Sequence, residues 1–136
     1  MLALPAVAEA PVSFGTLEIE VKGIAAITGT LNVGVHEKAD TFPDGAKAPL
    51  KAIAVKVVSN PQLIVIEHVP YGVHAVSVWH DADGNAEMKK GLFGIPKEPI
   101  GVSNNVRPTL GPPSFDDAKF ELKTEKKKLA IEVFVP

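Results

Sequence analysis

The fold is decided by two adjoining runs of sequence, Val73-His74-Ala75-Val76-Ser77-Val78-Trp79 and His80-Asp81-Ala82-Asp83-Gly84-Asn85. Both faces of the first run are apolar or small, which is typical of a strand at the centre of a sheet or under loops. The second run is rich in Asp, Asn and Gly, the residues that turns favour. We therefore expect a buried strand that ends in an acidic loop.

Alternating strands precede this centre. Phe14 to Ile24 alternates apolar and polar residues, as does Gly29 to Glu37, so Gly23 to Thr28 is expected to form a hairpin between neighbouring strands. Two more β-branched runs, Lys51 to Val58 and Gln62 to Val69, each end close to a proline. The first half of the chain therefore predicts four strands.

A long irregular stretch, Gly91 to Pro113, follows the acidic loop. Gly and Pro recur too often there for a helix or a central strand, and long loops of this kind are often functional. The next residues, 114–118, fit one helical turn because Ser114 can cap it and an aspartate follows three residues later. Phe120 to Leu122 and Lys128 to Val135 supply the closing strands.

This pattern predicts an all-β protein. About seven short strands, no long helix and many Pro and Gly turns indicate an antiparallel β-sandwich of immunoglobulin-like or transthyretin-like type, with one long irregular loop. A chain of 136 residues has the length of one domain. We expect that domain to cover residues 11–136.

Composition excludes several classes of function. The absence of cysteine excludes disulfides and thiolate chemistry. The formal net charge is −2 and no basic, aromatic-rich face is visible, so we do not expect a nucleic-acid-binding protein. No apolar run reaches the ~18 residues that span a bilayer. Outward charges on a presumed edge strand, Phe14 to Ile24, discourage edge pairing and predict a monomer.

Residues 1–10 suggest export. Small residues at Ala6, Ala8 and Ala10 form an A-x-A-like pattern of the kind that signal peptidases cleave. We interpret this segment as the remnant of a secretory signal or as a disordered N-terminus. The first interpretation predicts a periplasmic or secreted protein.

Several motifs in fixed order carry a resemblance to a known family. They are His80-Asp81 with its Asp/Asn/Gly loop, Gly94-Ile95-Pro96-Lys97-Glu98, Ser103-Asn104-Asn105 and Gly111-Pro112-Pro113-Ser114-Phe115. In these motifs the chain resembles a bacterial family of small exported proteins, domain-of-unknown-function family 2141. The resemblance implies a periplasmic or secreted β-sandwich of no established activity. The chain departs from the family pattern at His74, Ala86 and Lys89.

The acidic loop has the spacing of a cation-binding loop. Asp81, Asp83 and Asn85 stand at alternate positions, from which one loop aims several hard oxygens at a single Ca²⁺, and Glu87 is placed to add a backbone carbonyl. The carboxylate that closes such loops is missing from its usual position. A glutamate from elsewhere, such as Glu98, has to complete the shell.

A purely structural interpretation of the same loop stays open. Asp81 and Asp83 then bond the amides of a tight turn, and Gly84-Asn85 supplies its left-handed conformations. Lys89 and the following lysine also bring positive charge to the loop. We therefore predict no cofactor, with Ca²⁺ as the alternative.

The leading functional prediction is a non-enzymatic binding or accessory module with its site on the loops between residues 80 and 115. Its partner is an unidentified small molecule or protein. One alternative is a small hydrolase that uses His80, Asp81 and loop carboxylates, although no serine lies in a Gly-x-Ser-x-Gly context and no catalytic residue is assigned. Another alternative is a structural domain stabilised by Ca²⁺. The candidate ligand-binding residues are His80, Lys97, Glu98, Asn104 and Ser114.

Overall fold

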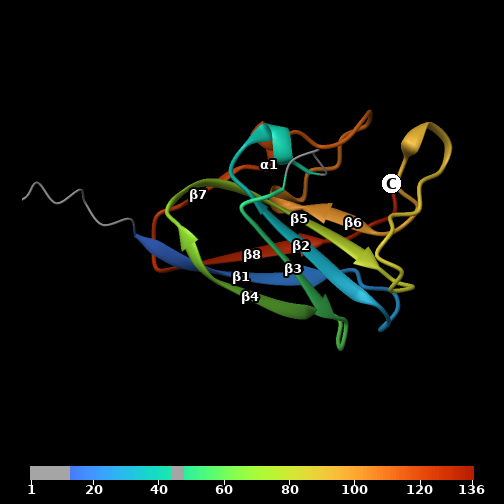
Figure 1. Cartoon of the computed structure of the whole chain (residues 1–136), viewed down its shortest axis with the longest axis horizontal. Helices are drawn as coiled ribbons and strands as arrows, with labels where there is room; N and C mark the ends of the chain where they lie inside the picture. The colour runs from blue at the N-terminus through green and yellow to red at the C-terminus, as the bar shows by residue number, and fades with distance from the viewer. Residues whose placement is uncertain (1–12, 44–47) are drawn as a thin grey trace, which may run out of the picture.

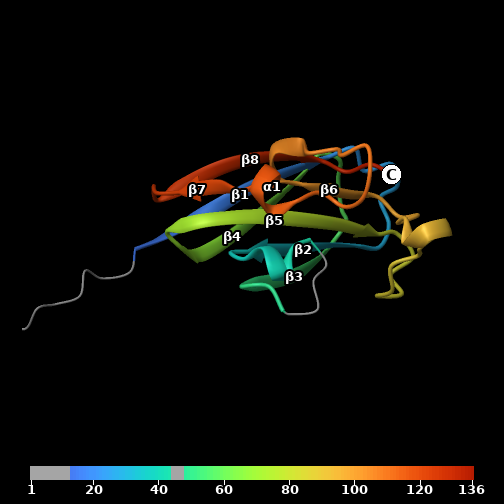
Figure 2. The ribbon, with the colours of Figure 1, turned by 90° about the horizontal axis from the view of Figure 1, so that it is seen from above.

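Two β-sheets pack face to face to form the molecule (Figures 1 and 2). This computed structural model describes residues 13–43 and 48–136, and these residues contain eight strands and one short α-helix. The expected all-β sandwich is therefore confirmed, while the immunoglobulin-like or transthyretin-like type stays a prediction. The proposed signal remnant at residues 1–10 lies outside the described residues.

The smaller sheet has the order β4-β1-β8. It consists of β4 (Gln62–Pro70), β1 (Phe14–Lys22) and β8 (Lys126–Glu132), and β1 runs antiparallel to β4 but parallel to β8. The prediction that β1 is an edge strand was wrong, because neighbours cover both of its sides. One of its outward charges is paired within the sheet, with Lys126 Nζ 3.0 Å from Glu18 Oε1. The monomeric state stays a prediction without this support.

The larger sheet has the order β3-β2-β5-β6, and β7 also pairs with β5. Its strands are β3 (Lys51–Lys56), β2 (Thr30–His36), β5 (Gly72–Asp81), β6 (Ile100–Val102) and β7 (Phe120–Leu122). The strand that ends in the acidic loop is β5, which lies between neighbours as its apolar faces predicted. The short strand β6 falls inside the stretch that was expected to be a loop.

The connection from β1 to β2 crosses from one sheet to the other. The hairpin predicted for Gly23 to Thr28 was therefore wrong, since alternation shows that two strands exist but not that they pair. Gly29 is needed for this crossing because it has φ +68° and a Cβ atom there would collide with the carbonyl oxygen of Asp81. The crossing segment thus packs directly against the beginning of the acidic loop.

The main core lies between the two sheets and is aliphatic. It combines inward residues of the smaller sheet with those of the larger sheet, among them Leu17, Ile19, Ile131, Leu31, Val33 and Val78. A second, smaller apolar cluster is formed by Phe42, Ala75, Val102 and Ala118. The core thus fixes β5 from both sides, as its burial shows.

Four short helical turns complete the fold: η1 (Ala39–Thr41), η2 (Leu92–Gly94), η3 (Ser103–Asn105) and α1 (Phe115–Ala118). The helical turn predicted after Pro113 is confirmed as α1. Ser114 Oγ accepts a hydrogen bond of 3.1 Å from the backbone N–H of Asp117, which is the predicted cap.

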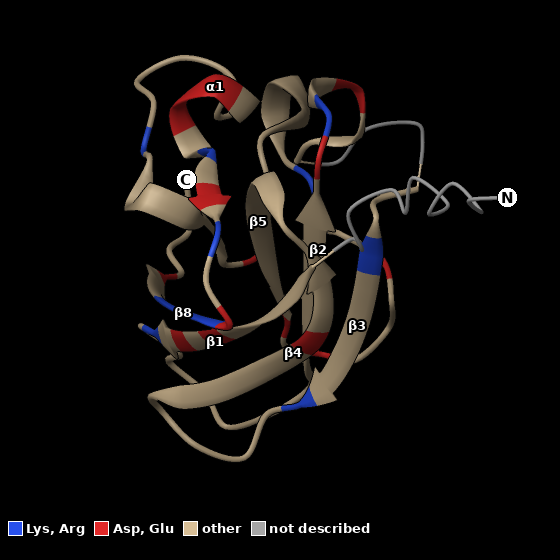
Figure 3. Ribbon diagram, turned by 90° about the vertical axis from the view of Figure 1, so that its left-hand side faces the viewer, with Lys and Arg blue, Asp and Glu red and all other residues tan. Residues whose placement is uncertain are grey.

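Charges of both signs are interspersed over the side of the molecule seen in Figure 3. Lysines stand at both ends of β3, and acidic residues lie on α1. Within the described residues, no helix has the length and apolarity needed to cross a bilayer.

Candidate functional site

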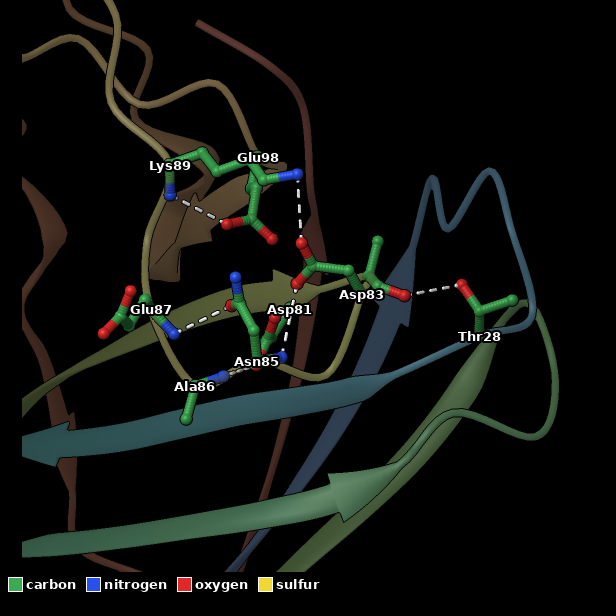
Figure 4. A network of polar contacts seen from close by, with 9 residues as sticks. Thr28, Asp81, Asp83, Asn85, Ala86, Glu87, Lys89 and Glu98 are labelled. Carbon is green, nitrogen blue, oxygen red and sulfur yellow. Dashed lines mark hydrogen bonds and ion pairs between the residues drawn. The ribbon is translucent and has the colours of Figure 1, made fainter.

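The acidic loop leaves the end of β5 from a fixed starting point. The ring of His80 lies in the interior and its Nε2 donates to the carbonyl oxygen of Thr28 at 2.8 Å. Thr28 Oγ1 in turn donates to the carbonyl oxygen of Ala82 at 2.9 Å (Figure 4). The crossing segment between β1 and β2 therefore clamps the loop immediately beside Asp81.

A small hairpin brings the far end of the segment back to its beginning. The N–H of Lys97 donates to the carbonyl oxygen of Lys89 at 2.8 Å, and Lys90 and Pro96 form a β-bridge. Glu98 follows directly after this closed hairpin. Its side chain consequently returns to the residues with which the loop began.

Three carboxylates meet at this place. One oxygen from each of Asp81, Asp83 and Glu98 lies within 4.8 Å of the others (Figure 4). Asp81 and Glu98 are buried, at 1% and 6% exposure, and Asp83 is exposed. Buried carboxylates this close together repel one another unless a cation or a proton compensates for their charge.

Backbone N–H groups donate hydrogen bonds to one oxygen of each buried carboxylate. Asp81 Oδ2 accepts from the N–H of Ala86 at 2.8 Å, and Glu98 Oε1 accepts from the N–H of Lys89 at 2.8 Å. Ala86 adopts φ +61°, so it takes the left-handed conformation that a glycine would adopt more easily. The other oxygen of Asp81, Oδ1, is buried and has no hydrogen-bond partner in the structure.

Lys89 makes a cationic contact with one of the three carboxylates. Its Nζ lies 3.0 Å from Asp83 Oδ2, and the side chains of Lys89 and Asp83 are 61% and 39% exposed. The hydrogen bond from Lys89 holds the pKa of the Asp83 carboxyl below its usual value, and Asp83 raises the pKa of Lys89. An exposed pair of this kind contributes little to stability and is easily displaced.

The remaining two residues of the predicted cation loop serve its turns. Asn85 Oδ1 accepts from the N–H of Glu87 at 2.9 Å, and the N–H of Asn85 donates to Asp83 Oδ1 at 3.3 Å. Asp81 and Asp83 thus come together, Glu98 joins them, and the side chains of Asn85 and Glu87 stay exposed.

The other candidate ligand-binding residues lie apart from this cluster. Lys97 borders an open apolar hollow with Leu92, Ile95 and Val135. Asn104 Nδ2 donates to the carbonyl oxygens of Asp117 and Lys119, at 3.0 and 2.9 Å. Ser114 caps α1, and His80 faces the core. The structure therefore does not gather these residues around one site.

No hydrolase constellation forms around His80 in the described residues. His80 and Asp81 are consecutive in a strand, so their side chains point to opposite faces, and no hydrogen bond joins them. Ser103 is fully buried and donates to the carbonyl oxygen of Ala118 at 2.6 Å. It is therefore placed to hold α1 and not to attack a substrate.

A second polar cluster was not visible in the sequence. His36 Nδ1 lies 2.9 Å from Thr41 Oγ1, and its Nε2 lies 2.8 Å from Ser77 Oγ. Burial lowers the pKa of His36, so the ring is neutral near pH 7. Only the β2–β5 register, which places Gly34 opposite Ser77, brings these residues together. The cluster ties η1 to the sheet.

The comparison with protein families covers this whole region. A family model described as an uncharacterized protein conserved in bacteria (DUF2141) matches residues 19–130, which include the acidic loop, the hairpin and Glu98. The chain belongs to this family. The resemblance stated from the sequence motifs is confirmed by this match. No curated protein and no solved structure matches the chain.

Proposed function

We propose that this member of the DUF2141 family is a non-enzymatic binding module that acts outside the cytoplasm and binds Ca²⁺ at the end of its sandwich. The ion is held between Asp81, Asp83 and Glu98. The observation that supports this most strongly is Asp81 Oδ1. Of the four buried side-chain atoms that lack a partner within the described residues, it is the only carboxylate oxygen, and its residue belongs to the three-carboxylate cluster.

The spacing of the carboxylates suits Ca²⁺. Ca²⁺ binds oxygens at about 2.3–2.6 Å, so oxygens on opposite sides of one ion stand up to ~5 Å apart. The observed limit of 4.8 Å for Asp81, Asp83 and Glu98 allows all three to bind one ion. Mg²⁺ requires shorter bonds of about 2.0–2.1 Å in near-ideal octahedral geometry. Because Ca²⁺ takes about six to eight oxygens, waters or backbone carbonyls would have to fill the remaining positions.

The expected affinity agrees with an extracellular setting. Three carboxylates with an exposed member and a competing lysine make a weak to moderate site, with a dissociation constant on the order of 10⁻⁵ to 10⁻³ M. Sites in this range are filled where Ca²⁺ is abundant, as it is outside cells. The A-x-A-like pattern of residues 1–10 supports the same location.

Calorimetric titration with Ca²⁺, together with thermal melts in Ca²⁺ and in chelator, tests the proposal. Ca²⁺ at ~100 times its dissociation constant stabilises the folded state by about 2.7 kcal/mol, a shift of several degrees. Asp81→Asn and Glu98→Gln should each weaken binding at least about ten-fold, since each removes a charged ligand.

Asp116→Asn is the matched control because this aspartate lies on α1 and its side chain is 85% exposed. It should bind Ca²⁺ as the unchanged protein does. The absence of any calorimetric signal at millimolar Ca²⁺, or an Asp81→Asn variant that binds normally, would show that the three carboxylates are not a cation site.

A further inference from the structure

The hairpin that precedes Glu98 has an exposed apolar tip. Leu92, Phe93 and Ile95 are 77%, 90% and 48% exposed. Leu92 and Phe93 belong to η2, which Figure 1 shows at the extremity of the long loop, away from both sheets. Consecutive large apolar side chains at such exposure are uncommon unless they meet a partner.

The tip is held in this conformation by the backbone. The N–H of Gly94 donates to the carbonyl oxygen of Gly91 at 3.2 Å, and the N–H of Gly91 donates to that of Ile95 at 2.7 Å. Phe93 adopts φ +58°, a left-handed conformation that non-glycine residues seldom take. The outward aromatic ring is therefore presented by a closed turn.

The charge around the tip depends on the cation. Between residues 81 and 98 the chain has four carboxylates and three lysines, a net charge of −1. One Ca²⁺ changes this net charge to +1. The ion also competes with Lys89 for Asp83, to which Lys89 is bonded at 3.0 Å. Binding of the ion thus changes the net charge of this segment from negative to positive.

We propose that this tip docks onto an anionic lipid bilayer when the cation is bound. Leu92 and Phe93 enter the interfacial region, and the lysines beside them face lipid phosphates, which is the combination that interfacial segments use. This inference rests on the proposed cation site. The hairpin couples the cation site to the tip. Glu98 Oε1 accepts a hydrogen bond from the backbone N–H of Lys89, and the carbonyl oxygen of Lys89 accepts one from the N–H of Lys97 at the base of the hairpin.

An anionic bilayer fits these features better than a second copy of the chain does. The narrow tip carries its apolar groups next to lysines. One divalent ion makes the net charge of residues 81–98 positive, so this segment is then attracted to an anionic surface that would otherwise repel it. The open apolar hollow beside the tip is lined by Leu92 and Val135 and also by Lys97, so a cationic side chain borders the apolar surface.

Vesicle sedimentation of the full chain tests the proposal. Vesicles of phosphatidylcholine with 30% phosphatidylserine, as the probe, should bind the protein in Ca²⁺ at least ten-fold better than in chelator, and better than pure phosphatidylcholine vesicles. The double variant Leu92→Ser/Phe93→Ser should lose at least ten-fold in vesicle binding while calorimetry shows normal Ca²⁺ binding. Val58→Ser is the control, since Val58 is 66% exposed on the β3–β4 connection.

The outcomes separate the two proposals. Normal Ca²⁺ binding without vesicle binding, or equal vesicle binding by the double variant, overturns the docking proposal and leaves the cation site intact. If calorimetry shows no Ca²⁺ binding by the unchanged protein, both the cation site and the docking proposal are overturned. Ca²⁺-dependent dimerisation in sedimentation velocity that the double variant abolishes, without vesicle binding, assigns the tip to a second copy and also overturns docking.

Discussion

The acidic loop and η3 are both rich in small polar residues, yet their side chains are used differently. In η3, Ser103 bonds to two buried backbone groups, and Asn105 bonds to the carbonyl oxygen of Ala130 at 3.1 Å and to the N–H of Glu132 at 2.9 Å. In the acidic loop, Asp81 keeps one buried oxygen without a partner. The first region is satisfied within the chain, and the second is not.

This difference separates a structural polar motif from a candidate binding site. A buried polar group that is fully bonded stabilises the fold, while one left unbonded costs free energy unless something else completes it. Both regions fall inside residues 19–130, which match the family model. Family likeness therefore does not distinguish them, and only the hydrogen-bond partners do.

The largest expected effect is the loss of stability in Ser103→Ala. Ser103 Oγ accepts from the N–H of Val76 at 2.9 Å and donates to the carbonyl oxygen of Ala118 at 2.6 Å. The substitution leaves both buried groups unpaired and should lower the free energy of unfolding by about 2–4 kcal/mol. Urea denaturation measures this loss. Unchanged stability, or weakened Ca²⁺ binding in the folded variant, would break the comparison.

Ser114→Ala should have a smaller effect of the same kind. It removes the cap of α1 and should lower the free energy of unfolding by about 1 kcal/mol, whereas Ser114→Asp keeps a capping oxygen and should not. Thermal melts of both variants decide this. Calorimetry should show normal Ca²⁺ binding in each, and a selective loss in Ser114→Ala would make this residue part of the site after all.

Lys89→Gln tests the other side of the comparison. The ammonium of Lys89 competes with a cation for Asp83, so its removal should raise the affinity for Ca²⁺ by about three-fold. Lys56→Gln, which removes an exposed lysine of β3, should change the affinity less. The readout is calorimetric titration at low salt. Weaker binding in Lys89→Gln would mean that this lysine supports the site.

The smallest expected effect is a pH dependence. Lys89 lowers the pKa of Asp83 from the ordinary 3.8, so their pair stabilises the fold above that pH and is lost as the pH falls through the lowered pKa. In Lys89→Gln the pKa of Asp83 should move back toward 3.8. A carboxyl-carbon NMR titration follows this directly, and an unmoved pKa would contradict the assigned cause.

Sequence patterns were sufficient for the elements that are determined locally. Three features depend only on residues that are close together in the sequence. They are the apolar faces of β5, the turn residues of the acidic loop and the cap of α1. Asp81 and Asp83 were identified for the same reason, since alternate positions in one loop bring their carboxylates together.

Long-range contacts were the part that the sequence concealed. The β1–β2 connection crosses between the sheets, and its Gly29 packs against the carbonyl oxygen of Asp81, fifty-two residues away in the chain. The contact of His36 with Ser77 requires the β2–β5 register. The sequence offers Glu98 as a residue to complete the cation shell, but only the closed hairpin from Lys89 to Lys97 shows that Glu98 reaches Asp81.

The parallel pairing of β1 with β8 has a consequence for how the protein folds. Its register joins Thr16 to Lys126 and Lys22 to Glu132, so the smaller sheet closes only when residues more than a hundred positions apart meet. Pairings of such long range are associated with folding in milliseconds to seconds. Until β8 arrives, β1 has an open edge that can pair with another chain. In a nascent molecule the edge of β1 therefore stays open until β8 has been synthesised, well after β5 and the acidic loop.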